Sequence, residues 1–338
     1  MVDSSQLAES KSIHRRTGRT FYYATRLLPE RVRRATYVLY AFFRLADDVV
    51  DDADPSPPAA QRADLERLRA MALGERPPDD PVLAAFDELR VAHDIADEEI
   101  ETFVDAMLAD VEPDGYDTYA ELETYLCGSA VAVAYMMLAV MDPVERERAR
   151  PHAKALGEAF QLTNFLRDVR EDVVEYDRVY LPRATLERYG VSTADVTALR
   201  NSTGVRAAIR HELERAETLY REGVAGIRHL PEDCQFPVLL SAVLYAEHHR
   251  QIRERGYDTV SSTPSLSTRR SLRLVARTWW NWRRDQDPEA VFYRVSAVDP
   301  LDAEETGGTS ATVPDQPPAD GGQRGSTGGL VARVTDLL

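Results

Sequence analysis

One stretch of the chain, residues 116–141, restricts the possible folds more than any other. Apolar positions recur along it at helical spacing, and after Tyr125 every face of the helix is apolar. A helix of this kind cannot face water and needs other elements around it. Its longest apolar run, from Ala130 to Met141, has 12 residues and stops at Asp142, which is too short to span a bilayer. The stretch predicts a buried helix at the centre of a bundle, in a protein that is not integral to a membrane.

The rest of the chain supplies helices that can surround this one. Apolar residues recur at helical spacing elsewhere, and no segment shows the alternation of a strand or a repeat at a fixed interval. We expect a helix that begins at Pro29–Glu30 and is stopped by the segment 54–58. Further helices are expected over 59–73, 81–91, 96–109, 143–175 (one long helix or a broken pair), 205–229, 235–255 and, as the last helix, 267–284. The predicted fold class is all-α.

A change in composition marks the end of the folded part. After about residue 298, Gly, Pro, Ser, Thr and Asp dominate as far as residue 329, and apolar residues are almost absent. Such a segment cannot bury enough apolar surface to fold. We therefore expect one helical domain over residues 1–297 and a disordered acidic tail rich in Gly, Pro and Ser over residues 298–338.

The charge balance of the chain excludes some classes of partner. The formal net charge is −16, and only two of the 41 basic residues, Lys11 and Lys154, are lysines. An acidic, lysine-poor surface is typical of halophilic proteins in a very salty cytosol, where salt screens self-repulsion. No basic patch outweighs this acidic charge, so nucleic acid is not expected as a partner. Cys127 and Cys234 form no CxxC motif, and no apolar signal region precedes residue 20, so a cytoplasmic location is expected.

An acidic motif ends the helix that begins near residue 30. One stripe of this helix carries, at spacings of 3, 4, 3 and 4, the residues Tyr37, Tyr40, Arg44, Asp47 and Asp51. Asp47/Asp51 and Asp48/Asp52 are both i,i+4 pairs, and like charges at this spacing cost a helix roughly 0.2–0.5 kcal/mol per pair. A bound cation removes that penalty, and Mg²⁺ prefers such oxygen ligands together with substrate phosphates. A solvated acidic helix end in an acidic protein is the alternative.

A second polar stripe lies in the expected helix over 143–175. Gln161, Asn164, Asp168 and Asp172 follow each other at spacings of 3, 4 and 4, which places them on one helical face. Apolar residues flank the stripe, whereas an open surface more often carries Glu/Arg pairs. Two helices with such aspartate pairs can face each other across a bundle and hold Mg²⁺ ions that clamp a diphosphate. The ions and the neighbouring arginines then stabilise the charge on a departing diphosphate.

The two motifs together resemble those of the squalene/phytoene synthase family, the head-to-head prenyltransferases, and are most similar to a phytoene synthase. The resemblance covers most of residues 14–260. It rests on the segments 40–51 and 161–172, on Tyr125, and on the segments 177–182 and 256–258. It implies the class I isoprenoid synthase fold, a helical bundle around a central apolar cavity, and a prenyltransferase activity.

The resemblance also implies roles for individual residues. The metal ligands for Mg²⁺, with Mn²⁺ as a substitute, would be Asp47, Asp48, Asp51, Asp168 and Asp172. Substrate-binding side chains would be Arg19, Arg44, Gln161, Asn164 and Arg178. Around the reacting carbons would lie Tyr40, Arg44, Tyr125 and Tyr180. For the tyrosines, core packing with a satisfied hydroxyl is the alternative.

The reaction implied by the resemblance is the condensation of two geranylgeranyl diphosphates through prephytoene diphosphate to phytoene, without NADPH. Residues 130–141 and 236–245 are expected to line the channel for the tails. One alternative is a squalene or dehydrosqualene synthase acting on farnesyl diphosphate. Another is a catalytically silent family member that acts as an assembly factor, which would be expected to lose aspartates from one motif. The expected partners are prenyl diphosphate substrates; peripheral membrane contact for product release and the oligomeric state are left open.

Overall fold

The computed structural model describes residues 25–50 and 56–300, and every regular element in these two ranges is helical. The predictions for Arg19, Asp51, Asp52 and the tail beyond residue 300 concern residues outside the described ranges. The α-helices are α3 (Glu30–Val50), α4 (Pro58–Ala72), α5 (Pro81–His93), α6 (Asp97–Asp110), α7 (Tyr119–Leu126), α8 (Ala132–Met141), α9 (Arg146–Arg167), α10 (Val169–Tyr176), α11 (Arg183–Arg188), α12 (Thr193–Thr197), α13 (Thr203–Ala225), α14 (Glu232–Glu254), α15 (Thr268–Trp282) and α16 (Pro288–Val295). The predicted fold class is confirmed.

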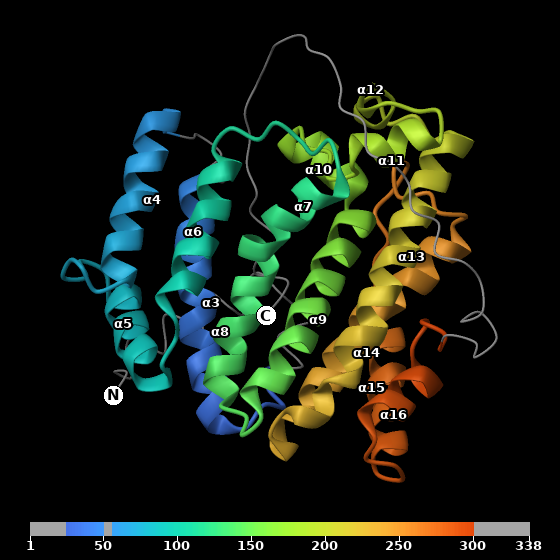
Figure 1. Ribbon diagram of the computed structural model, residues 1–338. Helices are drawn as coiled ribbons and strands as arrows, with labels where there is room; N and C mark the ends of the chain where they lie inside the picture. The colour runs from blue at the N-terminus through green and yellow to red at the C-terminus, as the bar shows by residue number, and fades with distance from the viewer. Residues whose placement is uncertain (1–24, 51–55, 301–338) are drawn as a thin grey trace.

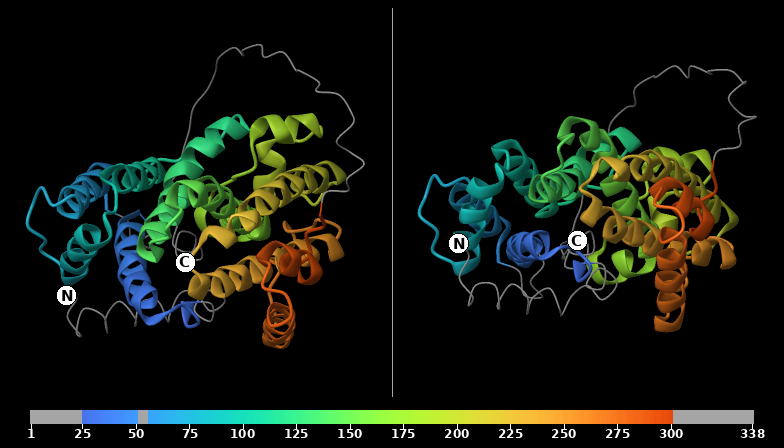
Figure 2. Two further views of the ribbon diagram at one scale, coloured as in Figure 1. Left: turned by 60° about the horizontal axis from the view of Figure 1, so that its bottom comes forward. Right: turned by 90° about the horizontal axis from the view of Figure 1, so that it is seen from below.

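The helices form a bundle whose centre is the pair α8 and α9. These two helices run side by side, with α3 and α6 on one side and α13 and α14 on the other (Figure 1). The helices α15 and α16 pack on each other and on α14 at the periphery, where Figure 2 shows them in orange and red. The helices that carry the site described below are therefore held in place by contacts with their neighbours in the bundle.

The apolar stretch predicted as one central helix is helical but interrupted. A π-helical turn over Cys127–Val131 separates α7 from α8. Within this turn, a Cβ atom on Gly128 would lie only 2.3 Å from the backbone oxygen of Thr102, so α6 approaches too closely for a side chain there. The stretch Tyr119–Met141 is long and apolar enough to cross a membrane, yet 78% of its most apolar window is buried inside the protein. It is the core helix that its pattern predicts.

The stretch expected as a long helix or a broken pair is a broken pair. The break falls at Asp168, whose φ and ψ of −101° and 16° depart from helical values. The amide of Asp168 still donates to the oxygen of Asn164 at 2.9 Å, and the amide of Asp172 donates to the oxygen of Asp168 at 2.8 Å. These i→i−4 bonds keep the register of the polar stripe across the break.

The expectation that 267–284 is the last helix is wrong, because α16 follows it. Asp287 caps α16 by accepting bonds from the amides of Glu289 and Ala290, and Pro288 occupies its first turn. Its side chains Val291, Phe292 and Val295 are fully buried. At eight residues the helix is too short for periodicity alone to reveal, and its stability comes from this packing.

A buried polar network fixes α9 against α13 and α14. The hydroxyl of Thr163 on α9 lies 3.0 Å from that of Tyr220 on α13 and 2.9 Å from Nε2 of His249 on α14. Nδ1 of His249 lies 3.1 Å from a carboxylate oxygen of Glu217. Burial lowers the pKa of His249, so its ring remains neutral within the network. Directional bonds of this kind set the rotation of α9 about its axis, and with it the aim of the neighbouring Gln161 and Asn164.

Candidate active site

One stripe of α9 and α10 changes from small apolar residues to polar residues along its length. At spacings of 4, 4, 4, 3, 4 and 4 it carries Ala149, Ala153, Gly157, Gln161, Asn164, Asp168 and Asp172. Positions three and four apart share a helical face, so these side chains line one continuous surface. The first three line an apolar cavity, and the last four are buried. The same surface can therefore contact a ligand that is apolar at one end and polar at the other.

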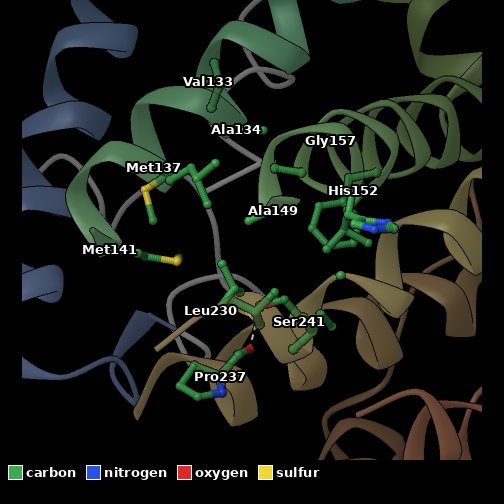
Figure 3. Close-up of a pocket in the computed structure, with 18 of the residues that line it drawn as sticks. Val133, Ala134, Met137, Met141, Ala149, His152, Gly157, Leu230, Pro237 and Ser241 are labelled. Atoms are coloured by element: carbon green, nitrogen blue, oxygen red, sulfur yellow. Dashed lines mark hydrogen bonds between the residues drawn. The ribbon is translucent and has the colours of Figure 1, made fainter. Parts of the chain in front are cut away.

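The apolar cavity lies between α8, α9, the end of α13 and the start of α14. Its empty space, counted together with the solvent at its open side, is about 830 Å³. Figure 3 shows Met137 and Met141 from α8 facing Leu230 and Pro237 across it. The hydroxyl of Ser241 donates to the oxygen of Pro237 at 3.1 Å and so adds little polarity to the wall. The predicted central apolar cavity is confirmed, and both stretches expected to line it contribute residues.

The two central helices approach closely beside the cavity. A Cβ atom on Gly157 would lie 3.1 Å from the Cβ atom of Ala134 and 3.1 Å from the backbone oxygen of Ala130. Ala134 itself lines the cavity. The size of the side chain at position 134 therefore sets the width of the cavity at this level.

The first acidic motif turns one carboxylate inward and another outward. Asp47 is completely buried, and among the described residues neither of its carboxylate oxygens has a hydrogen-bond partner. Burial raises its pKa well above the usual value, the Arg44 guanidinium opposes this rise, and the charges of Asp48 and Asp110 add to it. Asp48 is 61% exposed and pairs with Arg44 at 2.7 Å. The carboxylate of Asp47 thus offers two buried oxygens that could bind a cation.

The second acidic motif is buried and contains two amides with unsatisfied atoms. Asp168 receives two bonds from the guanidinium of Arg167, at 2.8 and 2.5 Å, and Asp172, four residues later on α10, is also buried. Nε2 of Gln161 and Oδ1 of Asn164 are buried and have no hydrogen-bond partner within residues 25–50 and 56–300. An unsatisfied buried polar group costs about 1–3 kcal/mol, and such groups call for an explanation such as a ligand.

A buried aspartate that the sequence reasoning missed connects the two motifs. Asp110, the last residue of α6, accepts a bond from the hydroxyl of Tyr125 at 2.8 Å and pairs with the guanidinium of Arg178 at 3.4 Å. The amide of Arg178 in turn donates to the backbone oxygen of Asp172 at 3.0 Å. The charge of Asp110 also raises the pKa of Asp47 on α3. In the sequence Asp110 is a single acid at a helix end, which carries no signal of burial.

Aromatic rings surround this group of charges. The ring of Tyr180 stacks on that of Phe165, with centroids 3.9 Å apart and planes 8° apart, and Tyr125 lies about 6 Å from both. Tyr116 joins the cluster at 5.5 Å from Tyr125. Burial raises the pKa of Tyr125 well above its usual value, so its hydroxyl stays a donor. Tyr40 is fully buried one helical turn before Arg44 on α3. Of the predicted residues, Tyr125, Arg178 and Tyr180 are brought together around Asp110.

The described residues fit a divalent ion only in part. Within 25–50 and 56–300, no three Asp, Glu, His or Cys side chains lie close enough together to hold a metal ion. The chemistry of the donors nevertheless suits Mg²⁺, because the unpartnered oxygens of Asp47 are hard anionic ligands. Asp51, the other end of its i,i+4 pair, belongs to the segment outside the described residues.

Comparison with known proteins decides the family. A sequence model of the squalene/phytoene synthase family matches residues 14–276. A phytoene synthase of Thermus thermophilus is 34% identical over 276 residues, which cover 80% of this chain and 91% of that protein. The chain belongs to the squalene/phytoene synthase family.

Other relatives agree with this assignment. A 15-cis-phytoene synthase of Synechococcus elongatus is 33% identical over 287 residues, which cover 80% of this chain and 91% of that protein. The solved structure of a dehydrosqualene synthase in complex with a ligand superposes with a TM-score of 0.74 at 27% identity, over 83% of this chain and 98% of that one. A squalene synthase from Alicyclobacillus acidocaldarius superposes with a TM-score of 0.68 at 25% identity, over 75% of this chain and 95% of that one. This family member is a prenyltransferase with the class I isoprenoid synthase fold, from a family whose chemistry on prenyl diphosphates depends on divalent metals.

The buried pair of Asp110 and Arg178 predicts a large stability difference between two similar substitutions. Asp110→Ala leaves the buried Arg178 charge without its counterion, and we expect it to lower the free energy of unfolding by about 3–5 kcal/mol. The matched control is Asp117→Ala, because Asp117 pairs with Arg183 at the surface, where ion pairs contribute roughly 0–1 kcal/mol. Urea denaturation at constant KCl measures both. Equal losses in the two variants would contradict the importance of the buried pair.

The burial of Asp47 predicts that this side chain lowers the free energy of unfolding of the protein when no metal is added. With EDTA present at pH 7–8, we expect Asp47→Asn to raise the free energy of unfolding by about 1–3 kcal/mol, because it removes a buried, unpartnered charge. Since the pKa of Asp47 is raised in the folded state, the wild-type protein should lose stability relative to the variant as the pH rises above 3.8. Added Mg²⁺ should stabilise the wild-type protein and leave the variant nearly unchanged. Asp64→Asn is the control, because Asp64 is 44% exposed and pairs with Arg67 at the surface. An Asp47→Asn variant less stable than the wild type in EDTA would refute the prediction.

Proposed function

We propose that this protein is a phytoene synthase that condenses two molecules of geranylgeranyl diphosphate, through prephytoene diphosphate, to phytoene. The observation that carries the proposal is the stripe on α9 and α10, which lines an apolar cavity with its first half and offers buried amides and carboxylates with its second. A prenyl diphosphate has this same division into an apolar tail and a polar head. The sequence relatives named above, at 33–34% identity, are themselves named phytoene synthases, which supports the C20 substrate.

The residues of the polar end have complementary tasks in this proposal. Arg44, Arg178 and Arg19 present positive charge to the diphosphates, and a planar guanidinium suits phosphate oxygens. The amides of Gln161 and Asn164 contact the diphosphate or its ligands, which would satisfy their unpaired atoms. Asp47, Asp48 and Asp51 would hold Mg²⁺ at one side and Asp168 and Asp172 at the other. Bound there, the metal would neutralise the charge of the leaving diphosphate.

The aromatic cluster and the cavity wall protect the carbocation formed when diphosphate leaves. The rings of Tyr125, Tyr180 and Phe165 lie together beside the charged end, where their faces can stabilise a cation. The hydroxyl of Tyr125 is directed to Asp110, which holds the ring in position. The tails lie against the apolar wall, which excludes water that would otherwise capture the cation.

Squalene or dehydrosqualene synthesis from farnesyl diphosphate is the second candidate. The two solved structures named above are a dehydrosqualene and a squalene synthase, and they match at 27% and 25% identity. A catalytically silent assembly factor is disfavoured, because the sequence keeps both aspartates of the second motif and all three ligands proposed for the first.

A product assay tests the proposed reaction. The full chain is incubated at high KCl with Mg²⁺ and either geranylgeranyl or farnesyl diphosphate, with and without NADPH, and the hydrocarbon is identified by chromatography. We expect phytoene from the C20 substrate without NADPH, and no product in EDTA. We also expect Asp47→Asn and Asp172→Asn each to reduce kcat by at least about a thousandfold, whereas Asp64→Asn retains activity. Squalene or dehydrosqualene as the favoured product would overturn the substrate assignment, and unchanged rates in both site variants would remove the aspartates from their role.

The cavity wall predicts that two substitutions change the preference between the C20 and C15 substrates in opposite directions. Ala134→Phe fills the space beside Gly157, so kcat/KM for the C20 substrate should fall more than that for the C15 substrate. Met137→Ala removes a side chain from the same wall and should change the ratio in the opposite direction. We expect a ratio change of about tenfold for Ala134→Phe, the scale of one or two methylene groups in an apolar pocket. Competition between the two substrates in one reaction gives the ratio directly, and equal losses on both would place the tails elsewhere.

A further inference from the structure

The C-terminal part of the domain contains a basic segment in an otherwise acidic protein. Between Thr259 and Arg284 the chain has no acidic residue, although it has 57 Asp and Glu in total. The same segment has six arginines, all on or directly after α15: Arg269, Arg270, Arg273, Arg277, Arg283 and Arg284. The local sign of the charge is thus opposite to that of the whole molecule.

The exposed face of α15 combines these arginines with apolar side chains. Leu272, Trp279 and Trp280 are 64%, 46% and 53% exposed, which is unusual for side chains of this size. With Ala276 they form an apolar patch, since all four lie within one side of the helix. Around the patch lie five exposed arginines, and together with the patch they form what we call the α15 surface: Leu272, Ala276, Trp279, Trp280, Arg269, Arg273, Arg277, Arg283 and Arg284.

The opposite face holds α15 firmly on the bundle. Leu274 and Thr278 are buried, and the ring of Trp282 lies 6.0 Å from that of Phe236 on α14. Arg270 pairs with the buried Glu247 of α14 at 2.8 Å. The inner face of α15 therefore attaches it to the bundle, while Trp279 and Trp280 keep about half of their surface exposed.

Two of the five exposed guanidinium groups lie near indole rings, and that of Arg277 donates to the backbone oxygen of Arg294. Among the residues that the structure describes, none of the five forms an ion pair with an acidic side chain. The guanidinium of Arg283 lies 5.0 Å from the ring centre of Trp279, and that of Arg284 lies 4.3 Å from the ring centre of Trp280. This arrangement presents an apolar patch and positive charge in the same direction.

We propose that the α15 surface docks on an anionic phospholipid bilayer. A helix with a basic border and exposed indole rings lies in the interfacial plane of a membrane, with its apolar residues at the level of the headgroups. Arginine stems extend along the apolar region while their guanidinium groups contact phosphates. Attraction between these arginines and anionic lipids acts directly at the contact, whereas the repulsion expected from the net charge of −16 is screened over about a Debye length.

The position of this surface supports a lipid occupant over a protein one. Phe236, which contacts Trp282, directly precedes Pro237 and Val238, and both of these line the apolar cavity. Figure 2 shows α15 at the outside of the bundle, where a flat surface can reach it. Docking here brings one wall of the cavity next to the bilayer, which suits apolar ligands that have low solubility in water. The inference concerns binding only and does not require the proposed C20 substrate.

The tryptophans make the docking directly measurable. All three tryptophans of the chain, Trp279, Trp280 and Trp282, are on α15, so intrinsic tryptophan emission reports on this helix alone. The full chain is mixed with vesicles of phosphatidylcholine, with or without 30% phosphatidylglycerol, and with brominated acyl chains in a parallel series. We expect a blue shift and bromine quenching with the anionic vesicles, and binding at least about tenfold weaker to the neutral ones. Raising KCl should weaken the binding.

Matched variants distinguish binding through the α15 surface from non-specific binding to vesicles. Trp279→Ser with Trp280→Ser, and separately Arg273→Gln with Arg277→Gln, should each weaken sedimentation with anionic vesicles by at least about tenfold. The controls are Val91→Ser with Val144→Ser and Arg67→Gln with Arg148→Gln, which alter exposed side chains on other helices and should bind as the wild type does. Circular dichroism verifies that each variant is folded. If the tryptophan variant unfolds, the proposal is tested by bromine quenching of the wild type and by the vesicle binding of the arginine variant.

Three results would overturn the proposal. The first is tryptophan emission that anionic vesicles leave unchanged. The second is vesicle binding that persists in both the tryptophan and the arginine variants. The third is emission already shifted before lipid is added, together with a dimer in sedimentation velocity, which would assign the surface to a second copy of the chain.

Discussion

The structure depends on enclosing charged groups at one end of an apolar cavity. Transfer of a carboxylate from water into a protein interior is costly unless it is paired. The described site meets this requirement unevenly: Asp168 is held by Arg167 and Asp110 by Arg178, whereas the oxygens of Asp47 accept no hydrogen bond. The pKa of Asp47 is raised mainly because its carboxylate is buried. A bundle can tolerate such a group only because the surrounding helices are strongly packed.

That packing is concentrated on α9, which contacts α8 on one side and α13 and α14 on the other. Small residues permit these contacts, since a Cβ atom on Gly223 would lie within 2.8 Å of the backbone of Leu156. The network of Thr163, Tyr220 and His249 then fixes how α9 is rotated. One face of the helix provides stability, and the face beside it carries both the apolar wall and the polar end of the site.

The same separation of faces recurs at α15 on the outside of the molecule. Its inner face packs through Leu274 and Thr278, while its outer face keeps tryptophans and arginines exposed. In both helices the residues that stabilise the fold differ from those that meet a ligand. The bilayer contact proposed for α15 lies beside the cavity wall formed by α14. Apolar molecules would then pass between the bilayer and the cavity along these two surfaces.

Much of the fold was predictable because helical periodicity is a local property. The apolar run at 130–141 requires a central position wherever the other helices lie, and the spacing of Gln161, Asn164, Asp168 and Asp172 places them on one face. The short α16 was missed because eight residues carry too little periodic signal and become stable only through tertiary contacts. The roles assigned to Arg19 and Asp51 remain predictions, since both residues lie outside the described ranges.

The sequence by itself determined that the chain is all-α, which stretch lies at its centre, and which helical faces carry carboxylates and amides. Only the tertiary structure decided that Asp47 is turned inward while Asp48 faces solvent, and that Asp110 joins Tyr125 and Arg178. The reason is that periodicity constrains neighbours three or four residues apart. The burial and pairing of a charge depend instead on side chains such as Asp110 and Arg178, 68 positions apart, which meet only when helices pack.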